Sequence, residues 1–174
     1  MGGWVDLDMV RYISLLLFIG LAWGQTNQVP STQVVMDSAF ETAKNENKHI
    51  LLIFHTNWCD FCKMFFEGFN NKDSEPFFKE SYIITTLNPL DKNHLVNDGA
   101  MEYYGELLEN DKVGWPSTFI IDKNGNKLDK YYGFPTSDNA IDSLLTVLNN
   151  FSQLDKEQND LYLDILAEYF KNMN

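Results

Sequence analysis

The chain has 174 residues, of which 44% are hydrophobic and 14% aromatic, and it carries a formal net charge of −12. This composition predicts one globular domain with a sizeable core and excludes a disordered chain. The acidic balance argues against a nucleic-acid-binding protein, because phosphate recognition needs a basic surface.

Residues 1–24 are predicted to be a signal peptide. Arg11 precedes an apolar run from Ile13 to Ala22, and small residues at Ala22 and Gly24 suit the positions that a signal peptidase recognises. The run is about half as long as a bilayer crossing requires, so no stable membrane span is expected after the signal is removed. The mature chain is therefore expected to begin near Gln25 and to be exported, to the periplasm or out of the cell.

A linker is expected at 25–36, followed by a domain over 37–151. Its first helix is expected from near Asp37, and a strand at about 50–55 follows. The apolar run of that strand is almost continuous, which is typical of a strand covered on both faces of a sheet. A helix is expected directly after Cys59.

The second half of the domain alternates helices and strands. A short helix from Asp73 or Ser74 should precede a strand at 82–87, a loop at 88–98 and a helix at 99–109. A strand at 119–121 and its partner at 127–132 are joined by an Asn-Gly turn, which is a strong hairpin signal. The last helix of the domain is expected to be capped by Thr136 or Ser137.

An additional amphipathic helix is expected within 152–174. Its apolar residues form one stripe at helical spacing, made of Leu161, Tyr162, Ile165, Leu166, Tyr169 and Phe170. We expect this stripe to pack on its own domain, with a partner surface as the alternative.

Both cysteines of the chain, Cys59 and Cys62, lie where a buried strand is expected to lead into a helix. A thiol in the first turn of a helix faces unpaired backbone N–H groups and the positive end of the dipole, which favour its thiolate. A second thiol one turn later lies close enough to form a disulfide. Because so short a loop constrains the unfolded chain little, we interpret the pair as a redox centre rather than a structural crosslink.

Two sequence motifs and the hairpin resemble the thioredoxin family in residue type and in order. They are Trp58-Cys59-x-x-Cys62-Lys63, then Trp115-Pro116-Ser117-Thr118, then the Asn-Gly turn. The resemblance covers roughly 37–151 and is nearest in kind to exported bacterial thioredoxin-like proteins. It implies an α/β fold, a three-layer sandwich whose mixed central sheet is flanked by helices, here with an extra C-terminal helix.

The same resemblance implies a thiol–disulfide oxidoreductase, with reductase or isomerase activity favoured over oxidant activity. Its partners would be protein thiols and disulfides and an upstream redox protein, and no cofactor is implied. Cys59 would be the nucleophile and Cys62 the resolving thiol. Pro116 matches the position of the family's cis-proline, and Trp58 and Trp115 would form apolar walls for the substrate.

Three positions depart from the family pattern. Ile53 stands where thioredoxins carry a buried aspartate that assists proton transfer. Asp60-Phe61 replaces Gly-Pro between the cysteines, and the charge of Asp60 is expected to disfavour the Cys59 thiolate. Trp115 is bulky for a residue whose backbone should pair with a substrate. His55 is interpreted as a packed residue rather than a base.

Two other functions are compatible with the same residues. A non-catalytic binding domain would keep the fold and use the terminal helix to contact a partner. A metal-handling module, for example for copper, would use Cys59 and Cys62 as thiolate ligands. No second ligand pair accompanies them, and His49, His55 and His94 are scattered, so no metal site is expected.

Overall fold

The computed structural model describes residues 29–93, 95–108 and 114–173. The predicted signal peptide at 1–24, the first four residues of the predicted linker (25–28) and His94 lie outside the described residues. Within the described ranges, no helix has both the length and the apolar character that a membrane crossing requires.

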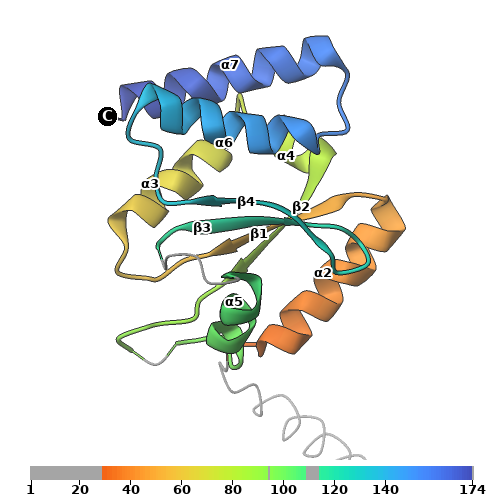
Figure 1. The fold of residues 1–174 in the computed structure, drawn as a ribbon, viewed down its shortest axis with the longest axis vertical. Helices are drawn as coiled ribbons and strands as arrows, with labels where there is room; N and C mark the ends of the chain where they lie inside the picture. Colours follow the sequence, from red (N-terminus) through yellow and green to blue (C-terminus); the bar gives the residue numbers. More distant parts are fainter. Residues whose placement is uncertain (1–28, 94, 109–113, 174) are drawn as a thin grey trace, which may run out of the picture.

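A four-stranded mixed sheet forms the centre of the molecule, in the order β2-β1-β3-β4 (Figure 1). Strand β1 pairs in parallel with β2 and antiparallel with β3, which in turn pairs antiparallel with β4. The bounds are β1 His49–Phe54, β2 Tyr82–Leu87, β3 Ser117–Ile121 and β4 Lys127–Tyr132. The predicted strands at 82–87 and 127–132 are therefore confirmed.

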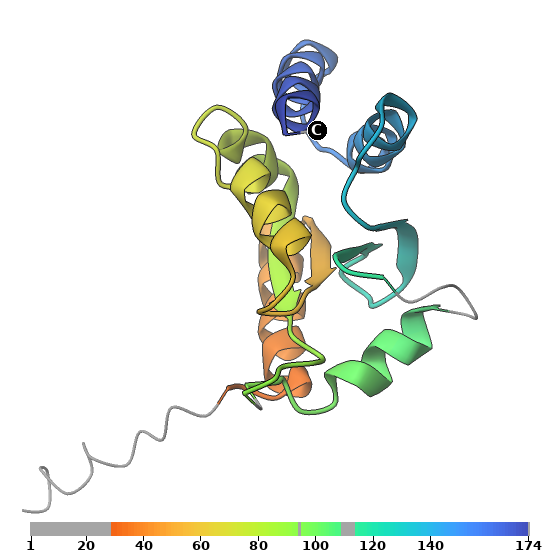
Figure 2. The same ribbon diagram turned by 90° about the vertical axis from the view of Figure 1, so that its left-hand side faces the viewer.

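Helices cover both faces of the sheet, as Figures 1 and 2 show. On one face, α3, α4, α6 and α7 pack over apolar side chains such as Leu51, Ile53 and Ile120. On the other face, α2 and α5 pack over Ile50 and Leu52 and their neighbours. This arrangement confirms the predicted three-layer α/β sandwich. The helices are α2 Thr32–Glu46, α3 Asp60–Phe69, α4 Glu75–Ser81, α5 Ala100–Leu108, α6 Asp138–Asn150 and α7 Lys156–Asn172.

Helix α2 begins at Thr32, earlier than the predicted start near Asp37. Ser31 caps it, because its Oγ accepts a hydrogen bond from the Val34 N–H at 3.4 Å. The prediction was wrong because Val34 and Val35 are weak helix formers, whereas Asp37 resembles a capping residue. The first turn of α2 thus lies in the segment expected to be a linker.

Helix α7 is present as expected and packs on its own domain. Leu166 and Phe170 are fully buried, and the Tyr169 hydroxyl donates to the Met64 carbonyl oxygen of α3 at 2.9 Å. Leu161, predicted to share the buried stripe, is instead 59% exposed. Five residues of helix rotate a side chain by about 140°, so Leu161 faces away from the side that buries Leu166.

Candidate active site

The two cysteines stand at the turn from β1 into α3. Cys59 is the N-cap of α3, in extended conformation, and its Sγ accepts the backbone N–H of Cys62 at 3.1 Å. A disulfide joins Cys59 to Cys62, with 5.2 Å between the Cα atoms. The side chains differ in access to solvent, because Cys59 is 8% exposed and Cys62 only 1%. Cys59 is therefore the outer sulfur and Cys62 the inner one.

The charge of Asp60, expected to oppose a thiolate at Cys59, is paired in the structure. The Lys63 ammonium lies 2.8 Å from the Asp60 carboxylate, on the exposed side of the first turn of α3. The hydrogen bond from Lys63 and its positive charge lower the pKa of Asp60. Lys63 thus offsets part of the negative field that Asp60 adds beside Cys59.

The second residue between the cysteines, Phe61, is packed against a distant part of the chain. Its ring stacks on Phe134 with centroids 5.5 Å apart and planes 22° apart. Phe134 in turn meets Phe170 of α7 edge-on at 5.6 Å. Aromatic contacts therefore lead from the turn between β1 and α3, which carries the two cysteines (the dithiol turn), to the C-terminal helix.

The sheet beneath the dithiol is apolar. Ile53 is completely buried and pairs in register with Thr118 of β3. No carboxylate is among the buried side chains of the described residues. His55, the first residue after β1, lies edge-on to Phe66 at 5.1 Å, and burial lowers its pKa. It is therefore packed and neutral near pH 7, as its interpretation as a packed residue requires.

A loop with a cis peptide bond between Trp115 and Pro116 lies next to the dithiol turn. The loop enters β3 at Ser117, and Ser117 pairs in register with Phe54, the last residue of β1. The sheet thereby brings Pro116 beside the strand end from which the cysteines follow. Trp58, next to Cys59 in the chain, is 46% exposed, and the Lys92 ammonium lies 5.6 Å from the centroid of its ring.

Tyr104 of α5 holds this loop, and sequence analysis did not identify it. The Tyr104 hydroxyl lies 2.8 Å from the Ser117 Oγ and 3.3 Å from both the N and the O of Gly114. Its ring packs on that of Trp115 with centroids 4.9 Å apart. Trp115 is thus partly buried against α5, and its remaining surface faces outward. The only sequence signal was that a buried tyrosine needs a partner for its hydroxyl.

Comparisons with known proteins agree with this geometry. A family model described as a thioredoxin-like domain matches residues 36–148. No curated protein sequence matches the chain. Among solved structures, the chain is similar to a disulphide isomerase from Xylella fastidiosa Temecula1, at 16% identity and a TM-score of 0.52, over 83% of this chain and 95% of that one.

Two further solved structures are similar at lower scores. One is the oxidised C-terminal domain of DsbD from Neisseria meningitidis, at 18% identity and a TM-score of 0.47, over 68% of this chain and 97% of that one. The other is described as DsbH oxidoreductase, at 20% identity and a TM-score of 0.49, over 70% of this chain and 84% of that one. At such identities, likeness to a solved structure bears on the fold and not on the substrate.

Proposed function

The chain belongs to the family of thioredoxin-like domains, and from that membership we propose that it exchanges disulfides with protein substrates through Cys59 and Cys62. One observation carries the proposal: a disulfide caps the N-terminus of α3 beside the loop that contains Pro116. We propose that the exchange takes place outside the cytoplasm, in the periplasm or after secretion, where protein disulfides persist. An upstream redox protein would return the dithiol to its working state.

In the reductase direction, the reaction begins from the reduced protein. The Cys59 thiolate attacks one sulfur of a substrate disulfide, so a new S–S bond forms and the substrate S–S bond breaks. The substrate thiolate that leaves takes a proton from water. The Cys62 thiolate then attacks the Cys59 sulfur, restores the Cys59–Cys62 disulfide and releases the second substrate thiolate. Two electrons pass from the dithiol to the substrate, and an isomerase would reverse the first step at a different substrate cysteine.

The surroundings of the two sulfurs support this division of roles. The Cys62 N–H and the positive end of α3 stabilise negative charge on Cys59. Because Ile53 occupies the site of the family's buried carboxylate, the Cys62 proton would leave to water rather than to an aspartate. Trp58, Trp115 and Pro116 would contact the substrate on either side of Cys59.

Single cysteine variants test the proposal with a protein disulfide such as insulin, followed by turbidity. Cys59→Ser should abolish reduction, because no exposed thiolate remains. Cys62→Ser should stop turnover and accumulate mixed disulfides, visible as a reductant-sensitive band on a gel. If the wild-type protein folds but reduces nothing, the chain is a binding module; if neither variant changes the exchange, the assignment of the cysteines is wrong.

The reduction potential of the Cys59–Cys62 couple decides the direction of electron flow. A value near that of thioredoxin, at about −270 mV, would indicate a reductase, and one at about −120 mV an oxidant. Equilibration with glutathione buffers, followed by alkylation of free thiols and mass spectrometry, gives this value.

A further inference from the structure

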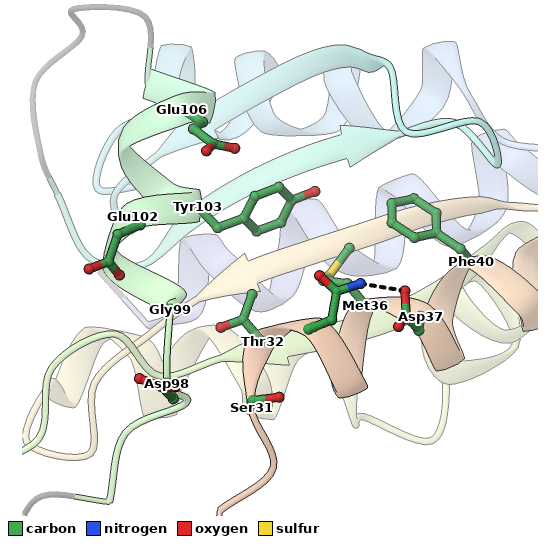
Figure 3. Close-up of a pocket in the computed structure, with 11 residues that line it drawn as sticks. Ser31, Thr32, Met36, Asp37, Phe40, Asp98, Gly99, Glu102, Tyr103 and Glu106 are labelled. Carbon is green, nitrogen blue, oxygen red and sulfur yellow. Dashed lines mark hydrogen bonds between the residues drawn. The ribbon is translucent and has the colours of Figure 1, made fainter.

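A groove of about 450 Å³ lies between α2 and α5, on the face of the sheet opposite α3 (Figure 3). Its apolar lining comes from Met36 and Phe40 of α2 and from Tyr103 of α5. Tyr103 points from α5 into the space between the two helices (Figure 3). The groove is therefore separate from the dithiol, and a ligand bound in it would leave Cys59 uncovered.

Among the described residues, four carboxylates and no lysine or arginine line this groove: Asp37, Asp98, Glu102 and Glu106. Within the described part of the chain, none of the four forms an ion pair, and Asp37 only accepts a hydrogen bond from the Gln33 amide at 2.8 Å. Glu102 and Glu106 are one helical turn apart and so share a face of α5. Like charges at this spacing repel each other, and a cationic ligand would relieve the repulsion.

Thr32 supplies an independent sign of a ligand. Its side chain lies on the groove wall, rising from the start of α2 toward α5 (Figure 3). Thr32 is only 7% exposed, and its Oγ1 has no hydrogen-bond partner among the described residues. A buried hydroxyl without a partner is unfavourable, so a ligand with a hydrogen-bonding group would stabilise this wall.

The arrangement of the charges distinguishes between kinds of cation. Among the described residues, no three His, Cys, Asp or Glu side chains are placed to hold one metal ion. The carboxylates instead come from two helices and from the loop before α5, around an apolar centre. Long basic side chains suit such a surface, because their methylene stems pack on apolar groups and their charged ends reach carboxylates or an aromatic face.

We propose that this groove binds an extended, lysine- or arginine-bearing segment of a partner polypeptide. The complementary charge of the groove identifies the occupant, and Tyr103 would pack against its side chains. Burial, and secondarily the charge of Glu106, raise the pKa of Tyr103, so its hydroxyl stays protonated and able to donate. Binding of this kind needs no cysteine, so it can be tested separately from disulfide exchange.

The test measures binding of a fluorescent, cysteine-free peptide of alternating lysine and glycine to the full oxidised chain, by anisotropy at about 0.15 M salt. The groove variant carries Glu102→Lys and Glu106→Lys. Its matched control carries Asp164→Lys and Glu168→Lys, at the same helical spacing on exposed positions of α7. Both pairs change the net charge equally, so only the location differs. Urea unfolding of each variant verifies that it is folded.

We expect the groove variant to bind the peptide about tenfold more weakly or worse, and the α7 variant within about twofold of the wild type. Equal losses in both variants would show attraction to overall negative charge and would overturn the proposal, as would absence of binding by the wild type. Thr32→Val, almost the same shape without the hydroxyl, should weaken binding several-fold; unchanged affinity would also overturn it. If calcium chloride displaced the peptide and sodium chloride of equal ionic strength did not, the occupant of the groove would be a metal ion and not a basic segment, which would overturn the proposal.

Discussion

Replacing Gly68 with alanine tests how tightly α7 is packed on the helix that carries the dithiol. A Cβ at Gly68 would lie 2.8 Å from the Tyr169 Cε1 and 3.3 Å from the Phe170 Cζ. The Tyr169 ring is not free to swing away, because its hydroxyl donates to the Met64 carbonyl at 2.9 Å. The added methyl must therefore displace either the ring or the helix.

The size of the effect follows from two opposing contributions. Alanine is favoured over glycine inside a helix by about 1 kcal/mol. Overpacking a filled contact destabilises by about 1–3 kcal/mol, and loss of the Tyr169 hydrogen bond adds about 1 kcal/mol. We expect Gly68→Ala to lower the free energy of unfolding by about 1–3 kcal/mol, which corresponds to about 2–4 °C in Tm for each kcal/mol.

Urea unfolding of Gly68→Ala beside two reference variants makes the experiment decisive. Beyond its own helix backbone, an added Cβ at Gly105 of α5 would meet no atom of the described residues within 4 Å. Gly105→Ala should therefore stabilise the protein by about 0.5–1 kcal/mol. In a Tyr169→Ala background, the penalty of Gly68→Ala should shrink by about 1 kcal/mol or more, because the clashing ring is gone. If Gly68→Ala stabilises the wild type as Gly105→Ala does, the described contact between α3 and α7 is incorrect.

Three further predictions concern the site and its surroundings. Tyr104→Phe removes the hydroxyl that holds Gly114 and should lower the free energy of unfolding by about 1–2 kcal/mol. It should also raise KM for protein disulfides more than KM for a small aromatic disulfide. Equal changes in KM for both substrates would contradict a role of Tyr104 in positioning the loop. Burial lowers the pKa of His55, so the folded protein takes up a proton there less readily than the unfolded chain does. The contribution of His55 to the free energy of unfolding is therefore greatest above its ordinary pKa of about 6.5, and it is lost as the pH falls through the lowered pKa of the folded protein. His55→Gln should reduce the loss of stability between about pH 7 and pH 5, measured by urea unfolding at each pH. Lys63→Gln removes the partner that lowers the pKa of Asp60, so NMR titration should find that pKa higher than in the wild type.

Local signals predicted most of the fold. The strand at 82–87 was recognisable because it lies between a short helix and a polar loop, and the strand at 127–132 because an Asn-Gly turn fixes its start. Both bounds agree with the structure. The start of α2 was missed because Asp37 resembles a capping residue and the valines before it are weak helix formers. In the structure Ser31 caps the helix, and Met36, which precedes the predicted start, is buried in the core.

Contacts between segments far apart in the chain could not be predicted from such local signals. Nothing near Tyr104 in the sequence indicates that its hydroxyl meets Gly114 and Ser117, since the choice of partner follows from how α5 lies on the sheet. The acidic groove likewise exists only because α2 and α5 lie side by side, although each carries unremarkable surface carboxylates. The pairing of Asp60 with Lys63 is the opposite case, because its spacing on one helix is visible in the sequence.

The contact between α3 and α7 also bears on the order in which the protein folds. Met64 and Tyr169 are 105 residues apart in the chain, so their hydrogen bond closes a long loop. Contacts between near neighbours form sooner than contacts that need such a closure. Cys59 and Cys62 therefore come within reach of each other before α7 covers the inner face of their helix. Cys62 is only 1% exposed in the folded protein, so an outside oxidant would reach it most readily in a chain that is not yet fully folded.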